Sequence, residues 1–164
     1  MYSKIILPTL SLILPSTLAG PDSIRSAIAS IAQNTTGTTN PRALANTAAD
    51  VGGYGCWCYI DSNHGKGKGH PVDSLDAECK QLHHNYECLI MDTEAAVEGA
   101  CEVAPWEVAY EKDVSVYIAM FTMDEAALGP ACDTANAGDA CKQAVCRSEM
   151  MFSLRVSGNA ITVW

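Results

Sequence analysis

Apolar side chains recur at helical spacing near the start of the chain. One helix face, at positions i, i+3, i+4 and i+7, is formed by Ile24, Ala27, Ile28 and Ile31. Asp22 or Ser23 can cap this helix, because a short polar side chain there accepts a backbone N–H. The pattern predicts an N-terminal helix that covers the core. A second, shorter helix is expected from Pro41 to Ala49, after a polar loop over 34–41.

A longer apolar stripe predicts a helix over about 73–98. The residues that share this face are Leu75, Cys79, Leu82, Tyr86, Leu89 and Ile90. Asp73 is expected as the N-cap. His83 lies four residues after Cys79 and three before Tyr86, so the pattern places its imidazole on the same face.

Two further elements are expected in the second half of the chain. Residues 106–121 alternate between apolar and polar positions around a polar turn at 111–113, which predicts a small β-hairpin packed on the core. A last long helix is expected over about 139–156, followed by an irregular tail at 157–164. The whole pattern predicts a mainly α-helical, single-domain fold in which two long helices form the frame.

Residues 1–19 have the features of a secretory signal peptide. Lys4 gives a short basic region, and the apolar run at 5–14 is too short to span a bilayer. Small residues before position 20 offer a cleavage site. We therefore expect a secreted domain over 20–164, in which Asn34 begins a glycosylation sequon.

Cysteine content and charge narrow the classes of function. Eight cysteines in a small secreted chain predict a disulfide framework, and the spacings Cys56–Cys58 and Cys141–Cys146 do not suit zinc. The formal charge is −9, and −10 once Lys4 is removed with the signal, which argues against nucleic acid as a partner. No segment predicts a transmembrane helix. A lipid surface that contacts this chain is expected to be zwitterionic or bound through apolar side chains.

The stretch 54–88 carries the most specific motif. It reads Tyr54-Gly55-Cys56-Trp57-Cys58, then a glycine-rich loop, then Pro71-Val72-Asp73-Ser74-Leu75-Asp76, and then a helix with Cys79 and His83. This order resembles the core of secreted phospholipase A2, in which a calcium loop precedes a helix bearing a His-Asp pair. The chain differs from that family in three ways. The gap from Cys79 to His83 and the loop are both longer, and His84 stands in the place of the metal-binding Asp.

The resemblance implies a fold and a reaction. The fold would comprise two long antiparallel helices, an N-terminal helix, a calcium-type loop and a small β-hairpin wing. His83 would act as the general base on a water that attacks the sn-2 ester of a glycerophospholipid, and Glu149 would orient its ring. The implied disulfides are Cys58–Cys79, Cys101–Cys141 and Cys132–Cys146, which leaves Cys56 to pair with Cys88.

Calcium is the cofactor that the resemblance implies. Its ligands would be backbone carbonyls near Trp57, Tyr59 and the stretch from Gly65 to Gly67. His84 offers a nitrogen without negative charge, so Asp61 in the longer loop, or else Asp76, would have to supply the carboxylate. Two alternatives stay open. The loop can be an exposed turn with two solvated lysines, and the register can shift so that His84 is the base and Asn85 faces the metal.

Three function classes are compatible with these residues. A calcium-dependent phospholipid hydrolase, weak or conditional because of His84, is the function that the motif order favours. A catalytically silent module with the same fold, acting in lipid or protein binding, is the alternative. A disulfide-rich toxin or inhibitor would explain the cysteines but not the order of the motifs.

Overall fold

The computed structural model describes residues 24–30, 51–59 and 66–162, with side chains as far as Ser157. A helix over 24–30 is followed by α3 (Ser74–Glu94), the 3₁₀ helix η1 (Pro105–Glu107), α4 (Val114–Phe121), α5 (Glu125–Ala135) and α6 (Ala140–Thr162). Within these ranges there is no strand. The prediction of a mainly helical fold is therefore confirmed.

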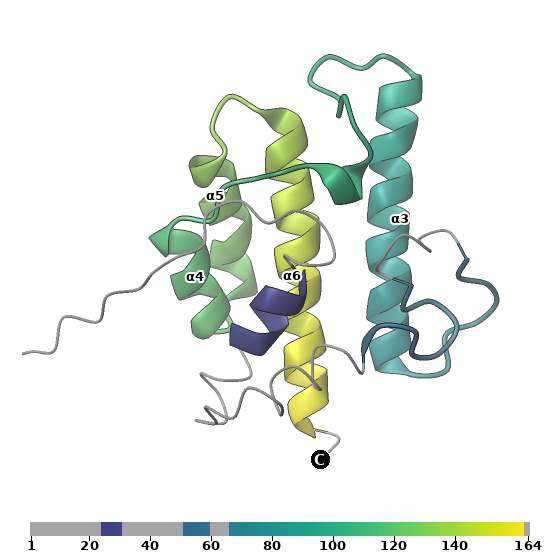
Figure 1. Ribbon diagram of the computed structural model, residues 1–164. Helices are drawn as coiled ribbons and strands as arrows, with labels where there is room; N and C mark the ends of the chain where they lie inside the picture. Colours follow the sequence, from purple (N-terminus) through teal and green to yellow (C-terminus); the bar gives the residue numbers. More distant parts are fainter. Residues whose placement is uncertain (1–23, 31–50, 60–65, 163–164) are drawn as a thin grey trace, which may run out of the picture.

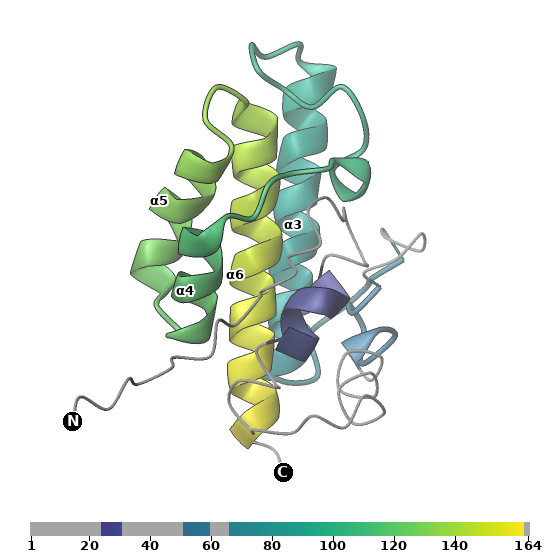
Figure 2. The ribbon, with the colours of Figure 1, turned by 60° about the vertical axis from the view of Figure 1, so that its left-hand side comes forward.

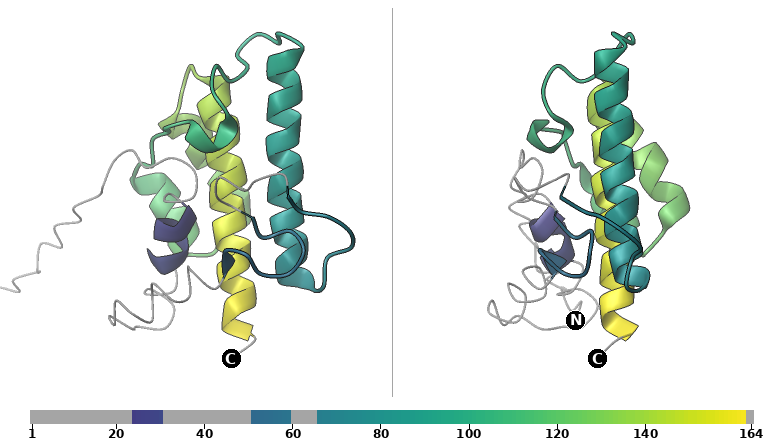
Figure 3. Two further views of the ribbon diagram at one scale, coloured as in Figure 1. Left: turned by 45° about the vertical axis from the view of Figure 1, so that its right-hand side comes forward. Right: turned by 90° about the vertical axis from the view of Figure 1, so that its right-hand side faces the viewer.

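The frame consists of α3 and α6, which run side by side in opposite directions (Figures 1 and 3). Arg155 near the end of α6 pairs with Glu78 near the start of α3, and Glu149 meets Tyr86 further along. Asp73 caps α3 as expected, since its carboxylate accepts the N–H of Asp76 at 3.0 Å. At the other end α3 stops at Ala95, and the next residue, Ala96, has a φ of 52°.

Two apolar clusters hold the remaining elements against this frame. One lies between α6 and the α4–α5 pair, and it contains Val116, Met120, Leu128, Val145 and Met150. The other joins α3, α6 and the helix over 24–30, and it contains Ile24, Ile28, Leu82, Tyr86 and Phe152. Figure 2 shows the resulting layers, with α4 and α5 on one side of α6 and α3 on the other. The buried face of the N-terminal helix confirms its predicted role in covering the core.

The predicted β-hairpin over 106–121 is wrong, because this stretch forms η1, an extended connection and α4. Asp113 caps α4 by accepting the N–H groups of Ser115 at 2.9 Å and Val116 at 3.1 Å. Burial then follows a helical period, since Val116, Ala119 and Met120 are buried. The alternation of apolar and polar positions suggested strands, but the cap and the period of three and four decide the local structure.

The last helix is also longer than expected. The predicted irregular tail from 157 continues as α6 to Thr162. Side-chain hydroxyls bond back one turn within it, from Ser153 to the Glu149 carbonyl and from Ser157 to the Ser153 carbonyl. Because such bonds satisfy the hydroxyls within the helix, serines here do not end it.

The disulfide framework contains three bridges: Cys58–Cys79, Cys101–Cys141 and Cys132–Cys146. These are the three pairs that the resemblance implies. The fourth expected pair is wrong, since Cys56 and Cys88 are both free thiols. Cys56 lies beside the start of α3, where Cys79 holds Cys58, whereas Cys88 is nine residues, or about 13 Å, further along the helix. A disulfide needs Cα atoms within about 7 Å, so these two cysteines cannot be joined.

No helix in the described part of the chain combines the length and the apolar character needed to cross a bilayer.

A first prediction concerns the two thiols. Alkylation of the folded, non-reduced protein should label Cys88, which is exposed, faster than the half-buried Cys56. Peptide mapping by mass spectrometry should then find the three bridges intact and both cysteines alkylated. A cross-linked Cys56–Cys88 peptide would contradict the structure.

Candidate functional site

A buried carboxylate fixes the segment 55–58 to the first turn of α3. Asp76 is fully buried, and its two oxygens accept the backbone N–H groups of Cys56 at 2.9 Å, Trp57 at 2.7 Å and Val72 at 3.0 Å. Gly55 allows this approach. Its φ is +60°, and a Cβ there would lie 2.5 Å from the Asp76 carboxyl carbon. The Cys58–Cys79 bridge adds a covalent link one turn further along.

Trp57 covers the next turn of α3. Its ring lies edge-on to His83 at 5.2 Å between centroids, and the Lys80 ammonium is 4.8 Å from the indole centroid. Gly67 packs closely against Trp57, since a Cβ there would approach Trp57 Cε3 to 2.5 Å. The indole N–H donates to the Gly69 carbonyl at 3.2 Å. The glycine-rich segment is therefore packed around a tryptophan.

The two adjacent histidines share one carboxylate on their own helix. His83 Nε2 lies 3.1 Å from Glu87 Oε1, and His84 Nδ1 lies 3.1 Å from Glu87 Oε2. His83 is buried and His84 is exposed. The expected partner of His83 was Glu149, across the helix pair. The carboxylate contact that the structure gives to its Nε2 is with Glu87.

Glu149 is fully buried at the centre of the molecule, and it joins three segments. Its Oε1 accepts the hydroxyl of Tyr86 on α3 at 2.6 Å, and its Oε2 accepts the hydroxyl of Tyr110, in the connection before α4, at 2.7 Å. Both tyrosines are buried, and the Tyr86 ring also meets Trp106 at 6.1 Å. Leu82, one turn before Tyr86, belongs to the same apolar cluster. The carboxylate thus lies in an apolar site with two phenol donors.

The surroundings of Glu149 shift the pKa of two neighbours. Burial, and then the negative charge of Glu149, raise the pKa of Tyr86 well above its ordinary value, so this hydroxyl remains a donor. Burial lowers the pKa of Lys112, while the charge of Glu149 opposes that shift. The Lys112 ammonium lies 5.6 Å from the Tyr110 ring centroid. A partly buried cation therefore stands near the buried carboxylate.

The carboxylates described beside the histidine pair are engaged within the protein. Asp76 accepts three N–H groups, and Glu87 contacts both histidines. The Trp57 carbonyl accepts the Tyr59 N–H at 2.7 Å. His84 supplies nitrogen, whereas Ca²⁺ prefers oxygen. Over the described ranges, no three His, Cys, Asp or Glu side chains are arranged to hold a metal ion. Asp61 and Gly65 lie outside those ranges, as do Asn34 and the expected signal peptide.

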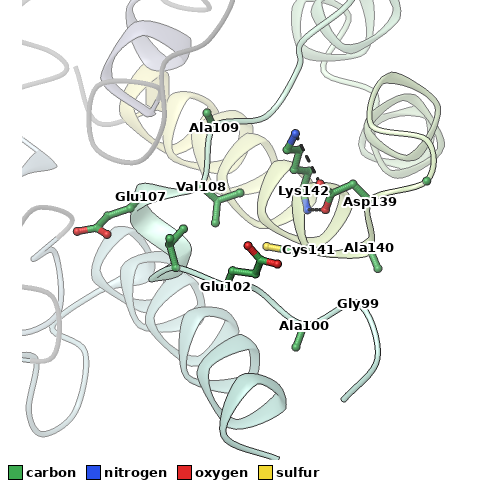
Figure 4. A pocket seen from close by; sticks show the side chains of 12 residues that line it. Gly99, Ala100, Glu102, Glu107, Val108, Ala109, Asp139, Ala140, Cys141 and Lys142 are labelled. Atoms are coloured by element: carbon green, nitrogen blue, oxygen red, sulfur yellow. Dashed lines mark hydrogen bonds and ion pairs between the residues drawn. The ribbon is translucent and has the colours of Figure 1, made fainter. Parts of the chain in front are cut away.

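A surface depression of about 480 Å³ lies elsewhere, around the Cys101–Cys141 bridge (Figure 4). It is formed by the connection between α3 and η1 and by the first turn of α6. Asp139 and Lys142 form an ion pair at 3.6 Å on its wall, drawn as a dashed line in Figure 4. His83 and Trp57 are not among its lining residues, so this depression is separate from the histidine pair.

The comparisons with known proteins find no matching family model, no matching curated protein and no matching solved structure. The phospholipase A2 resemblance therefore rests on the motifs of this chain.

Sequence reasoning missed the roles of three residues of the site. Glu87 has helical spacing from His83, i and i+4, which was a usable signal. Tyr110 carried no such signal, because its partner is 39 residues away and its own segment was expected to be a strand. Asp76 was considered as a metal ligand, whereas its oxygens hold backbone N–H groups.

A second prediction follows from the Glu149 contacts. Tyr86→Phe and Tyr110→Phe each remove one donor from a buried carboxylate, so each should lower the free energy of unfolding by about 1.5–3 kcal/mol. Tyr117→Phe, on a half-buried tyrosine of α4, is the matched control and should stay within about 0.5 kcal/mol. Urea unfolding followed by circular dichroism measures all three. Equal losses in the three variants would refute the assigned role of Glu149.

Proposed function

We propose that this protein is a secreted, disulfide-stapled helical module of phospholipase A2-like architecture that acts by binding lipid or protein and does not hydrolyse esters. One observation carries the proposal: His84, at the position where the resemblance expects a metal-binding carboxylate, presents an imidazole that contacts Glu87 at 3.1 Å. The two tyrosine hydroxyls on Glu149 make that carboxylate a link between segments. Secretion is supported by the three disulfides, which persist in oxidising compartments.

The donor chemistry near His84 points the same way. Phospholipid hydrolysis of the expected type needs a Lewis acid beside the ester carbonyl. The nearby carboxylates that could supply charged oxygen ligands are engaged by backbone N–H groups or by imidazoles. In addition, Trp57 lies against the ring of His83, and Gly67 packs against Trp57.

Hydrolysis of the sn-2 ester is the second candidate, and the contact between His83 and Glu87 favours it. A buried imidazole with one nitrogen held by a carboxylate at 3.1 Å is a workable general base. In that case Glu87 would orient the ring and Glu149 would serve the fold. The two candidates differ in one observable, the release of fatty acid.

A third prediction separates them. Fatty-acid release from phosphatidylcholine vesicles at millimolar calcium should be at background for the wild type, His83→Gln and Glu87→Gln, because Asp76 and Glu87, the carboxylates described beside His83, are engaged within the protein. A known lipase, added to the same vesicles, confirms that the substrate is competent. If the wild type releases fatty acid and His83→Gln does not, the proposal is overturned and the hydrolase is established.

The variant His84→Asp extends this test, because it restores a carboxylate at the position where the resemblance expects one. Isothermal titration with calcium is the readout. Tighter calcium binding by His84→Asp than by the wild type would show that the missing carboxylate at this position weakens calcium binding in the wild type. Equal calcium binding with strong wild-type affinity would mean that the metal position is elsewhere.

A further inference from the structure

The helix α4 is apolar on its outward face as well as on its inward face. Val116, Ala119 and Met120 are buried against the core. On the other side Val114 is 61% exposed and Ile118 is 57% exposed, one turn apart, with the half-buried Tyr117 between them. These three residues are called the α4 stripe below. Scattered exposed valines need no explanation, but a stripe at i, i+3 and i+4 forms one continuous surface.

The position of α4 leaves this stripe at the edge of the bundle. The helix packs on α5, which in turn packs on α6, and α3 lies on the far side of α6 (Figures 1 and 2). The stripe is therefore remote from the histidine pair. Burial of the inward face alone holds the helix in place, so its outward apolar residues are not required by the core.

Carboxylates flank α4 in the chain. Asp113 caps α4 directly before Val114, and Asp124, which caps α5, comes three residues after Phe121. Hydrogen bonds from Ser115 and the first turn hold the pKa of Asp113 below its ordinary value, so this side chain stays charged. Glu111, two residues before Asp113, is also exposed, and the whole chain carries a formal charge of −9. The α4 stripe with its acidic ends is therefore complementary to a partner surface that is apolar with basic ends.

We propose that the α4 stripe is a docking surface for a basic amphipathic helix of a partner protein. The apolar side chains of such a helix would cover Val114, Tyr117 and Ile118, and its lysines or arginines would meet the carboxylates at the two ends. Charge complementarity selects this occupant. A second copy would bring like charges together at both ends, and an anionic lipid surface would be repelled by the same groups.

This inference rests on the proposed binding function, for which it names a class of partner. Its test is independent of the ester-release assay, so the two proposals can fail separately. The α4 helix is about 12 Å long, which makes the contact small and the expected affinity modest.

A fourth prediction tests the surface with a defined probe. The probe is an 18-residue peptide of leucine and lysine, with the leucines at helical spacing. We expect saturable binding of this peptide to the full chain by fluorescence anisotropy, and a loss of at least about tenfold in affinity for Val114→Ser combined with Ile118→Ser. The matched control replaces Val97 and Val103, which are 50% and 51% exposed but lie between α3 and η1, and it should bind as the wild type does.

Other outcomes decide against this partner. A peptide of the same composition, scrambled to remove its apolar face, should bind weakly and equally to all variants, as should a peptide with glutamate in place of lysine. If the wild type binds phosphatidylcholine vesicles and the α4 variant does not, the α4 stripe is a lipid-binding surface. If the wild type self-associates in sedimentation experiments and the α4 variant does not, the α4 stripe is a dimer interface. Either result, or equal peptide binding by the α4 and control variants, overturns the proposal.

Discussion

The buried carboxylate of Glu149 is the constraint on which the arrangement of this fold depends. A carboxylate in an apolar interior is costly unless donors compensate it, and the donors here come from two other segments. Tyr86 fixes the register of α3 against α6, and Tyr110 draws the connection before α4 to the same point. Moving any one of these segments would leave the carboxylate with fewer donors. The three disulfides then hold an arrangement that this contact already specifies.

The same principle governs the first turn of α3. Asp76 is buried and collects three backbone N–H groups, so the segment 55–58 cannot leave the helix without exposing them. Trp57 is thereby held against His83, and Glu87 contacts both His83 and His84. Asp76 and Glu87, the carboxylates described beside the histidine pair, therefore serve the fold and neighbouring side chains.

The sequence was informative where the signal was local. The stripe from Leu75 to Tyr86 and the cap at Asp73 predicted α3, and the order of the cysteines, read through the resemblance, predicted three bridges. The α4 helix was mistaken for a strand because Val114, Val116 and Ile118 recur at a period of two, and α5 was not predicted. Gly129 and Pro130 within α5 are unfavourable in a helix interior, so tertiary packing decides that element. The bond from Tyr110 to Glu149 depends on a chain path that no short motif records.

The central claim is that Glu149 holds tyrosine hydroxyls while Glu87 holds the ring of His83. The most direct measurement is the ¹⁵N spectrum of the His83 ring in the folded wild type, Glu87→Gln and Glu98→Gln proteins, each confirmed as folded by circular dichroism. The account predicts that Glu87→Gln changes the Nε2 resonance of His83, whereas Glu98→Gln, on an exposed carboxylate beyond the end of α3, leaves it in place. An unchanged Nε2 resonance in Glu87→Gln would contradict the account, because Glu87 would then not be the partner of this nitrogen.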